Sequence, residues 1–337
     1  MEYRPLGPTG VRVSALGLGA LTFGRGMSGI AKVDQPTADR IVGRALEAGI
    51  NLFDTSDAWS AGESEEILGR ALAGRRDEVV LATRVGARRS SGVNDRGLTA
   101  LSIVRGCEAS LRRLRTESID LLQLAEPDPH TPFEETARAL DDLVRRGLVR
   151  YVGFANFPAW EVGLALGVQR AIGVRACVAL QTYYSLVGRD AESDLLPLAA
   201  RTDLAVLVSS PLAGGYLSGK YADGGAAIDD RRSMVPYPEV DEAAGAAAVV
   251  ALRQVAGDRD ATPAQVALAW LLRKPVTSLL VGVSQLRQLS ENNGALELHL
   301  TAEQVRTLDA LAVPRSRVEA DDWRHVLDDP LLGPPRT

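Results

Sequence analysis

The chain of 337 residues is 46% hydrophobic and 24% charged, which provides enough apolar material for a large core and excludes both intrinsic disorder and a small stapled scaffold. Its 38 basic and 43 acidic residues give a formal net charge of −5, so a nucleic-acid partner is not expected. The two cysteines are far apart, so no disulfide framework is expected. The N-terminus is unlike a signal peptide, and no apolar run reaches about 18 residues. A cytoplasmic protein with no membrane partner is therefore predicted.

The N-terminal residues 3–12 are predicted to form a short β-hairpin. The segment Gly7-Pro-Thr-Gly10 contains residue types that favour a tight turn. After it, short apolar runs alternate with amphipathic stretches along the chain. Eight of these runs are expected to be strands: 13–18, 50–53, 79–83, 119–124, 150–154, 177–180, 204–208 and 278–281.

Helix-like segments follow most of these strands. Ile103, Cys107 and Leu111 recur at helical spacing, and Gly49 and Gly147 stand where helices should end. Eight strands alternating with helices predict an α/β fold, a single (β/α)8 TIM barrel domain over residues 1–337 with the hairpin in front of it. A doubly wound sheet is rejected because the first strand is not followed by a GxGxxG motif.

The chain has two long segments outside the predicted strands and helices. Residues 222–241 follow the seventh strand and are rich in Gly, Ala and Asp, and the C-terminal tail 313–337 contains Trp323 and four prolines. Loops that follow the strands of such a barrel line its active face. The loop 222–241 is therefore expected on that face, whereas the tail either caps the face or packs on the outside of the barrel.

Several motifs stand in a characteristic order. Gly49-Ile-Asn-Leu-Phe-Asp54-Thr-Ser-Asp57 is followed by Tyr151-Val-Gly-Phe-Ala-Asn156 and by Ser210-Pro-Leu-Ala-Gly-Gly-Tyr-Leu-Ser-Gly-Lys220. With these motifs, over residues 5–312, the chain resembles the aldo-keto reductase superfamily. The resemblance implies a (β/α)8 barrel that binds NADP(H) without a Rossmann motif and reduces aldehydes and ketones to alcohols.

The resemblance also implies a catalytic tetrad of Tyr, Lys, Asp and His, of which this chain keeps only Asp54. Trp59 stands at the Tyr position, Arg84 at the Lys position and Ala125 at the His position. An indole does not release a proton at neutral pH, an arginine stays protonated, and an alanine has no polar side-chain atom. Asp54, Arg84 and Trp59 are the catalytic candidates of this degenerate tetrad, and Ala125 and Tyr183 are assigned to the substrate pocket.

The nicotinamide side of the implied cofactor site has also changed. Ala155 replaces the serine of a Ser-Asn pair and Ser209 stands where an aromatic ring commonly stacks, whereas Asn156 and Gln181 are kept. The adenosine side matches the branch that resembles potassium-channel beta subunits. The resemblance assigns cofactor binding there to Ser210, Leu212, Lys220, Arg232, Ser284, Gln288, Glu291 and Asn292. NADP(H) is thus expected either as a working cofactor or at a vestigial site.

These residues leave three functions open. The preferred one is a non-redox enzyme that eliminates, isomerises or cyclises a carbonyl-containing metabolite, with Asp54 as the base and Arg84 stabilising the enolate-like charge. The first alternative is an NADPH-dependent oxidoreductase that reduces a carbonyl or a conjugated C=C bond with an unusual acid. The second is a non-catalytic NADP(H)-sensing or accessory protein. We expect a small-molecule substrate and no metal. The pair of Asp54 with Arg84 is either a working catalytic pair or a structural salt bridge. The sequence leaves the oligomeric state open.

Overall fold

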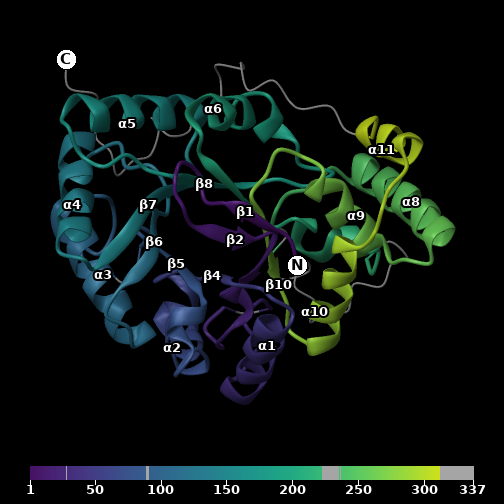
Figure 1. The fold of residues 1–337 in the computed structure, drawn as a ribbon, viewed down its shortest axis with the longest axis horizontal. Helices are drawn as coiled ribbons and strands as arrows, with labels where there is room; N and C mark the ends of the chain where they lie inside the picture. Colours follow the sequence, from purple (N-terminus) through teal and green to yellow (C-terminus); the bar gives the residue numbers. More distant parts are fainter. Residues whose placement is uncertain (28, 89–90, 222–234, 236, 312–337) are drawn as a thin grey trace.

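The computed structural model describes residues 1–27, 29–88, 91–221, 235 and 237–311. Within them, eight parallel strands form a closed barrel in the order β10-β3-β4-β5-β6-β7-β8-β9 (Figure 1). Strand β10 closes the barrel because it pairs with both β3 and β9. The predicted (β/α)8 barrel is therefore confirmed. Its strands are β3 (Leu16–Gly19), β4 (Leu52–Asp54), β5 (Val80–Val85), β6 (Ile119–Leu124), β7 (Val149–Ala155), β8 (Ala179–Tyr183), β9 (Ala205–Ser209) and β10 (Ser278–Gly282).

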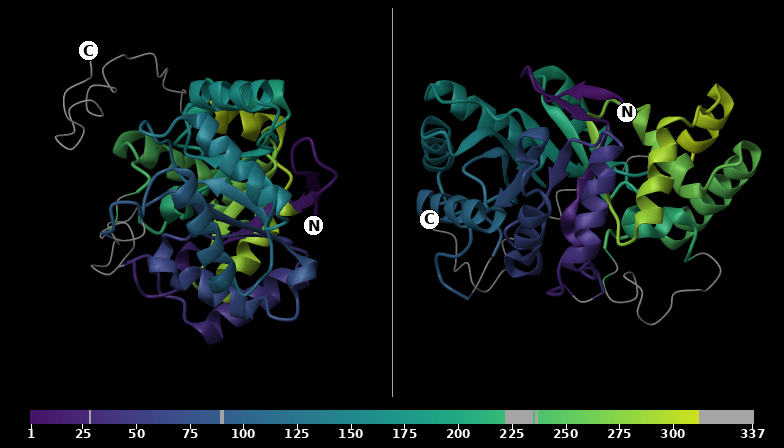
Figure 2. Two further views of the ribbon diagram at one scale, coloured as in Figure 1. Left: turned by 90° about the vertical axis from the view of Figure 1, so that its left-hand side faces the viewer. Right: turned by 60° about the horizontal axis from the view of Figure 1, so that its bottom comes forward.

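The helices surround the barrel, as the two further views show (Figure 2). Gly49 and Gly147 lie just beyond the ends of α1 and α4 with φ values of +82° and +74°, which a glycine adopts without strain. The described α-helices are α1 (Gln35–Glu47), α2 (Glu63–Ala71), α3 (Ala100–Leu114), α4 (Phe133–Arg145), α5 (Ala159–Ala171), α6 (Leu195–Thr202), α8 (Glu242–Arg259), α9 (Pro263–Leu272), α10 (Leu286–Asn293) and α11 (Ala302–Asp309).

The predicted N-terminal hairpin is present, with β1 (Tyr3–Pro5) antiparallel to β2 (Arg12–Ser14). The prediction of one strand over 13–18 was wrong, because the run is divided between β2 and β3. The Ser14 hydroxyl donates to the carbonyl oxygen of Leu16 at 2.6 Å, and the Ala15 N–H donates to the carbonyl oxygen of Glu2. These bonds interrupt the strand at a point where the apolar pattern gives no break.

The hairpin covers the amino-terminal end of the barrel strands. Leu6 is fully buried and packs in one cluster with interior residues of the barrel, including Leu52, Leu121 and Leu207. A Cβ at Gly7 would lie 2.2 Å from the carbonyl oxygen of Val178, so this close approach requires glycine. Packed apolar side chains therefore fill this end of the barrel, and polar groups gather at the carboxyl ends of the strands.

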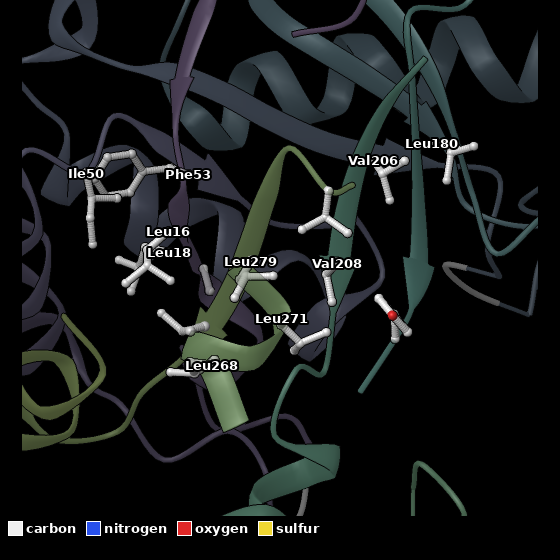
Figure 3. Close-up of a cluster of buried hydrophobic side chains, with 14 of the residues drawn as sticks. Leu16, Leu18, Ile50, Phe53, Leu180, Val206, Val208, Leu268, Leu271 and Leu279 are labelled. Carbon is white, nitrogen blue, oxygen red and sulfur yellow. The ribbon is translucent and has the colours of Figure 1, made fainter. Parts of the chain in front are cut away.

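A larger apolar core lies between the barrel and the helices. Figure 3 shows part of it, with Leu16 and Leu279 of the strands near Leu268 and Leu271 of α9. The helical periodicity seen in the sequence is confirmed for α3, where all three residues at that spacing face this core. Burial of one such side chain stabilises the fold by about 1.5–3 kcal/mol, so this layer fixes how the helices sit against the strands.

Some predictions fall outside the described residues. These are the tail 313–337, Arg232 and most of the loop 222–241. Among the described helices, none is both long enough and apolar enough to cross a membrane.

Polar contacts hold the end of α11 against α9 and the loop after β8. The Asp309 carboxylate accepts hydrogen bonds from Trp270 Nε1 at 2.8 Å and Lys274 Nζ at 2.7 Å, and its backbone carbonyl accepts one from Arg189 Nη1. Burial disfavours the charged form of Asp309, but the hydrogen bonds from Lys274 and Trp270 outweigh burial and lower the pKa of the carboxyl group.

This lowered pKa predicts an acid-sensitive contribution to stability. The contribution is fully present above the ordinary Asp pKa of 3.8 and is lost as the pH falls through the lower pKa of the folded state. Asp309→Asn is expected to reduce the free energy of unfolding by about 1 kcal/mol at pH 7, because charge-assisted bonds to a partly exposed group are lost. Urea unfolding at pH values from 7 to 3 should show that the difference in free energy of unfolding between the wild type and Asp309→Asn becomes smaller in acid. A gap that stays constant would contradict this assignment.

Candidate active site

A cavity of 660 Å³ opens at the carboxyl ends of the barrel strands. Asp54, Trp59 and Arg84 lie in its wall, as do ten of the predicted cofactor residues. Those ten are Asn156, Gln181 and Ser209 on the predicted nicotinamide side and Ser210, Leu212, Lys220, Ser284, Gln288, Glu291 and Asn292 beyond them. Segments far apart in the sequence thus meet around one space, as the barrel topology requires.

Asp54 occupies the last position of β4 and is almost completely buried, with 1% of its side chain exposed. Its Oδ2 accepts from Arg84 Nη2 of β5 at 2.6 Å. Its Oδ1 accepts from Gln123 Nε2 of β6 at 3.1 Å and from Gln181 Nε2 of β8 at 3.0 Å. Four strands therefore converge on one carboxylate, and the charged pair predicted at the barrel mouth is present.

Trp59 covers Arg84. The guanidinium carbon of Arg84 lies 4.6 Å from the centre of the Trp59 ring, a cation–π distance. Only Nη2 of Arg84 bonds to Asp54, and Nε is buried with no hydrogen-bond partner among the described residues. The side chain is 11% exposed and borders the cavity. A guanidinium with spare N–H donors therefore lies beneath an aromatic ring at the wall of the site.

The turn that presents Trp59 is strained. Ser60 and Ala61 have φ values of +50° and +54°, a region that costs non-glycine residues energy. The neighbouring loop holds this turn closely, since a Cβ at Gly26 would lie 2.8 Å from the Ser60 Cα. Packing of the loop therefore fixes the position of Trp59.

The two residues predicted for the substrate pocket do not line the cavity. Ala125 is buried, and its backbone carbonyl accepts a hydrogen bond from Asn156 Nδ2 at 3.0 Å. The Tyr183 hydroxyl bonds to Ser185 Oγ at 2.8 Å, and the Tyr183 ring lies against Gly188. The structure thus directs the Tyr183 phenol toward the loop that follows β8.

The predicted nicotinamide side contains an acceptor without a donor. Gln181 uses its Nε2 for Asp54 and Gln123, whereas its Oε1 is buried with no hydrogen-bond partner in the described part of the chain. Asn156 stands beside it in the left-handed region, with φ +59°, and its N–H donates to the backbone carbonyl of Gln181. A buried acceptor of this kind is costly unless a ligand supplies a donor.

The predicted pyrophosphate side is a turn that follows β9. The turn passes through positive φ values at Ser210, Ala213, Gly214 and Gly215. Lys220 closes it and places its ammonium group 4.5 Å from the centre of the Tyr221 ring. A turn of this kind with one lysine can bind phosphate through backbone N–H groups and a positive charge.

The predicted 2′-phosphate side is the start of α10. Gln288 Oε1 accepts hydrogen bonds from the Ser284 N–H at 2.8 Å and from the Ser284 hydroxyl at 3.2 Å, which fixes the loop before the helix. Arg287 of the first turn also lines the cavity, and its Nε donates to Gln285 Oε1. The positive end of a helix dipole beside an arginine suits an added phosphate group.

The sequence did not identify Gln123, Arg287, Lys32 or Tyr237 as site residues, although the last three line the cavity and Gln123 binds Asp54. Gln123 could have been found, because a glutamine in an otherwise apolar strand needs a hydrogen-bonding partner. Arg287 gave no such signal, since arginine makes up most of the basic residues of this chain.

Over the described ranges, no group of three or more His, Cys, Asp or Glu side chains could hold a metal ion. Cys107 and Cys177 are buried and unpaired. Burial raises the pKa of each thiol to about 12, so both stay protonated at neutral pH.

Comparison with known proteins identifies relatives of the whole barrel. The family model described as "Aldo/keto reductase family" matches residues 15–313. The "Uncharacterized oxidoreductase YrpG" of Bacillus subtilis (strain 168) is 37% identical over 323 residues, which cover 92% of this chain and 95% of the relative. The "Probable voltage-gated potassium channel subunit beta" of Oryza sativa subsp. japonica is 34% identical over 92% of this chain and 96% of its own. The protein of the same name from Arabidopsis thaliana is 32% identical over 88% of this chain and 92% of the relative.

Proposed function

This chain belongs to the aldo/keto reductase family, and from that premise we propose that it is an NADP(H)-dependent oxidoreductase without the usual proton-donating tyrosine. One relative is named an oxidoreductase. None of the three names given above supports the elimination, isomerisation or cyclisation that the residue changes suggested, so the oxidoreductase alternative fits better.

The surroundings of Asp54 also argue against a base at this position. Both carboxylate oxygens already accept hydrogen bonds, one from Arg84 and two from glutamines. A proton taken from a substrate would neutralise the carboxylate and would leave the cation of Arg84 without its buried counter-charge. Asp54 is better suited to holding Arg84 than to abstracting a proton.

The observation that carries the proposal is the unpaired Gln181 Oε1. This acceptor is buried without a donor in a residue of the cavity wall, and a carboxamide N–H of nicotinamide is a donor of the kind that it lacks. The other residues fit the same ligand: Lys220 and the turn after β9 suit a pyrophosphate, and Ser284 and Arg287 suit a 2′-phosphate. When bound, NADP(H) supplies hydride chemistry. Arg84 then holds a carbonyl oxygen of the substrate by its spare N–H groups, and Trp59 excludes water from that end of the cavity.

Isothermal titration with NADPH tests this proposal. We expect saturable binding with one site per chain and a Kd in the micromolar range. Lys220→Met should weaken binding of both NADPH and NADH about tenfold, because one charged contact is worth about 1.4 kcal/mol. Arg287→Gln should weaken only NADPH, since NADH lacks the 2′-phosphate.

The exposed Arg273, on another face, provides a matched control. Arg273→Gln should bind NADPH as the wild type does. Consumption of NADPH with a panel of aldehydes, ketones and enones would then establish the reaction. A lack of binding up to millimolar NADPH would overturn the proposal.

The names of two relatives favour a second candidate, an NADP(H)-binding accessory protein. This candidate requires the same cofactor residues but no reaction. Tight NADPH binding without consumption across the carbonyl and enone panel would favour it over the oxidoreductase.

A further inference from the structure

The wall of the cavity around Arg84 has features that the cofactor contacts do not use. Arg84 offers spare N–H donors, and Asp54 already balances its charge at 2.6 Å. The aromatic ring of Trp59 lies over it, and the side chains of Leu21, Met27 and Ile30 line the same cavity. Together these features indicate which kind of ligand would bind next to Arg84 and Trp59.

We propose that the site takes a neutral, planar, conjugated carbonyl compound, whose oxygen accepts hydrogen bonds from Arg84 and whose π system lies against Trp59. This inference rests on the proposed function and names the substrate class for the same site.

The oxygen is assigned to Arg84 because this guanidinium borders the cavity with only Nη2 bonded to Asp54, and a carbonyl oxygen is the simplest acceptor that a substrate brings. Neutrality follows from Asp54. A carboxylate ligand would lose its hydration on entering the site. The charge of Arg84 is already balanced by Asp54, so the attraction to Arg84 would not compensate for that loss.

The conjugated system is assigned to Trp59 because flat π systems stack on an indole in offset or edge-to-face geometry. Conjugation also suits a site without a proton donor. Charge that develops on a conjugated oxygen is spread over several atoms, so the fixed cation of Arg84 can stabilise it without a proton transfer at the oxygen. An isolated carbonyl would leave a localised alkoxide, for which the arginine is a poor acid.

Binding of 4-(dimethylamino)cinnamaldehyde tests the proposal without any turnover, with the protein saturated by NADP⁺. The absorption band of this dye moves to longer wavelength when its carbonyl oxygen bonds to a cation. We expect a red shift with the wild type and no shift with Arg84→Met. Trp59→Leu should keep the red shift but bind the dye about tenfold more weakly, whereas Trp160→Leu, at an exposed tryptophan on α5, should behave as the wild type does.

Competition against the dye tests planarity and charge. We expect 4-phenylbut-3-en-2-one to compete at least tenfold better than the saturated 4-cyclohexylbutan-2-one, and cinnamate to compete poorly. Tighter binding of cinnamate would overturn the neutrality of the ligand. No preference for the conjugated ketone, or a preference that Trp59→Leu leaves unchanged, would overturn the role of Trp59.

A folding defect in Arg84→Met is distinguished by Arg84→Lys, which keeps a cation and should keep part of the red shift. Failure of this inference is distinguishable from failure of the proposed function, because NADP⁺ binding is measured separately. Loss of dye selectivity with normal NADP⁺ binding would overturn only the inference. An absence of NADP⁺ binding would overturn the proposed function.

Discussion

Arg84→Met is expected to lower the free energy of unfolding by about 3–5 kcal/mol, a large part of the stability of a typical domain. The Asp54 carboxylate would remain almost fully buried but would lose its only cation within the described structure. Gln123 and Gln181 would still donate hydrogen bonds to it, although neutral amides stabilise a buried charge less than a guanidinium does. Urea unfolding at pH 7, followed by circular dichroism, measures this loss.

A double-mutant cycle separates the ion pair from simple loss of packing. Adding Asp54→Asn to Arg84→Met removes the unpaired charge and should recover much of the lost stability. The exposed pair of Arg75 with Glu78 is the matched control, at 2.8 Å with both side chains more than 40% exposed. Arg75→Met should cost less than about 1 kcal/mol. Equal losses for Arg84→Met and Arg75→Met would mean that the Asp54 pair is not the buried interaction inferred here.

The triple substitution Trp59→Tyr, Arg84→Lys and Ala125→His is expected to raise kcat/KM for reduction of an isolated ketone by at least about 100-fold. A phenol beside a lysine can give a proton to the carbonyl oxygen, which the indole of Trp59 cannot do. Ala125 does not line the cavity, but the longer side chain of a histidine at this position would extend beyond the buried methyl group and bring a further donor toward the site. Steady-state rates with NADPH and a saturated ketone measure the change.

The matched control replaces the phenol alone. Trp59→Phe with the same Arg84→Lys and Ala125→His has nearly the same shape but no hydroxyl, so its kcat/KM should stay near the wild-type value. Equal rates for the two triple variants would show that a proton donor is not what the site lacks. Ala155 and Ser209 would then be the next positions to change, since both depart from the family pattern on the nicotinamide side.

The strands and the family motifs could be predicted because their signals are local. Alternating apolar runs mark a strand wherever they occur, so β6 has the bounds that the sequence indicated and the other strands differ by a few residues at their ends. The departure at Ser14 came from a side-chain bond to Leu16 and a backbone bond to Glu2. A hydropathy pattern describes how apolar each residue is, so it cannot reveal either of these hydrogen bonds.

The sequence by itself determined a closed barrel, an N-terminal hairpin and the residue types at the family's catalytic and cofactor positions. Only the tertiary structure decided which of them meet. Gln123 and Gln181 are 58 residues apart, yet both bind Asp54 because β6 and β8 point them into the same barrel interior. Tyr183 turns toward Ser185, while Arg287 reaches the cavity from α10. The physical reason is that strand closure and packing fix side-chain directions, and these depend on neighbours distant in the chain.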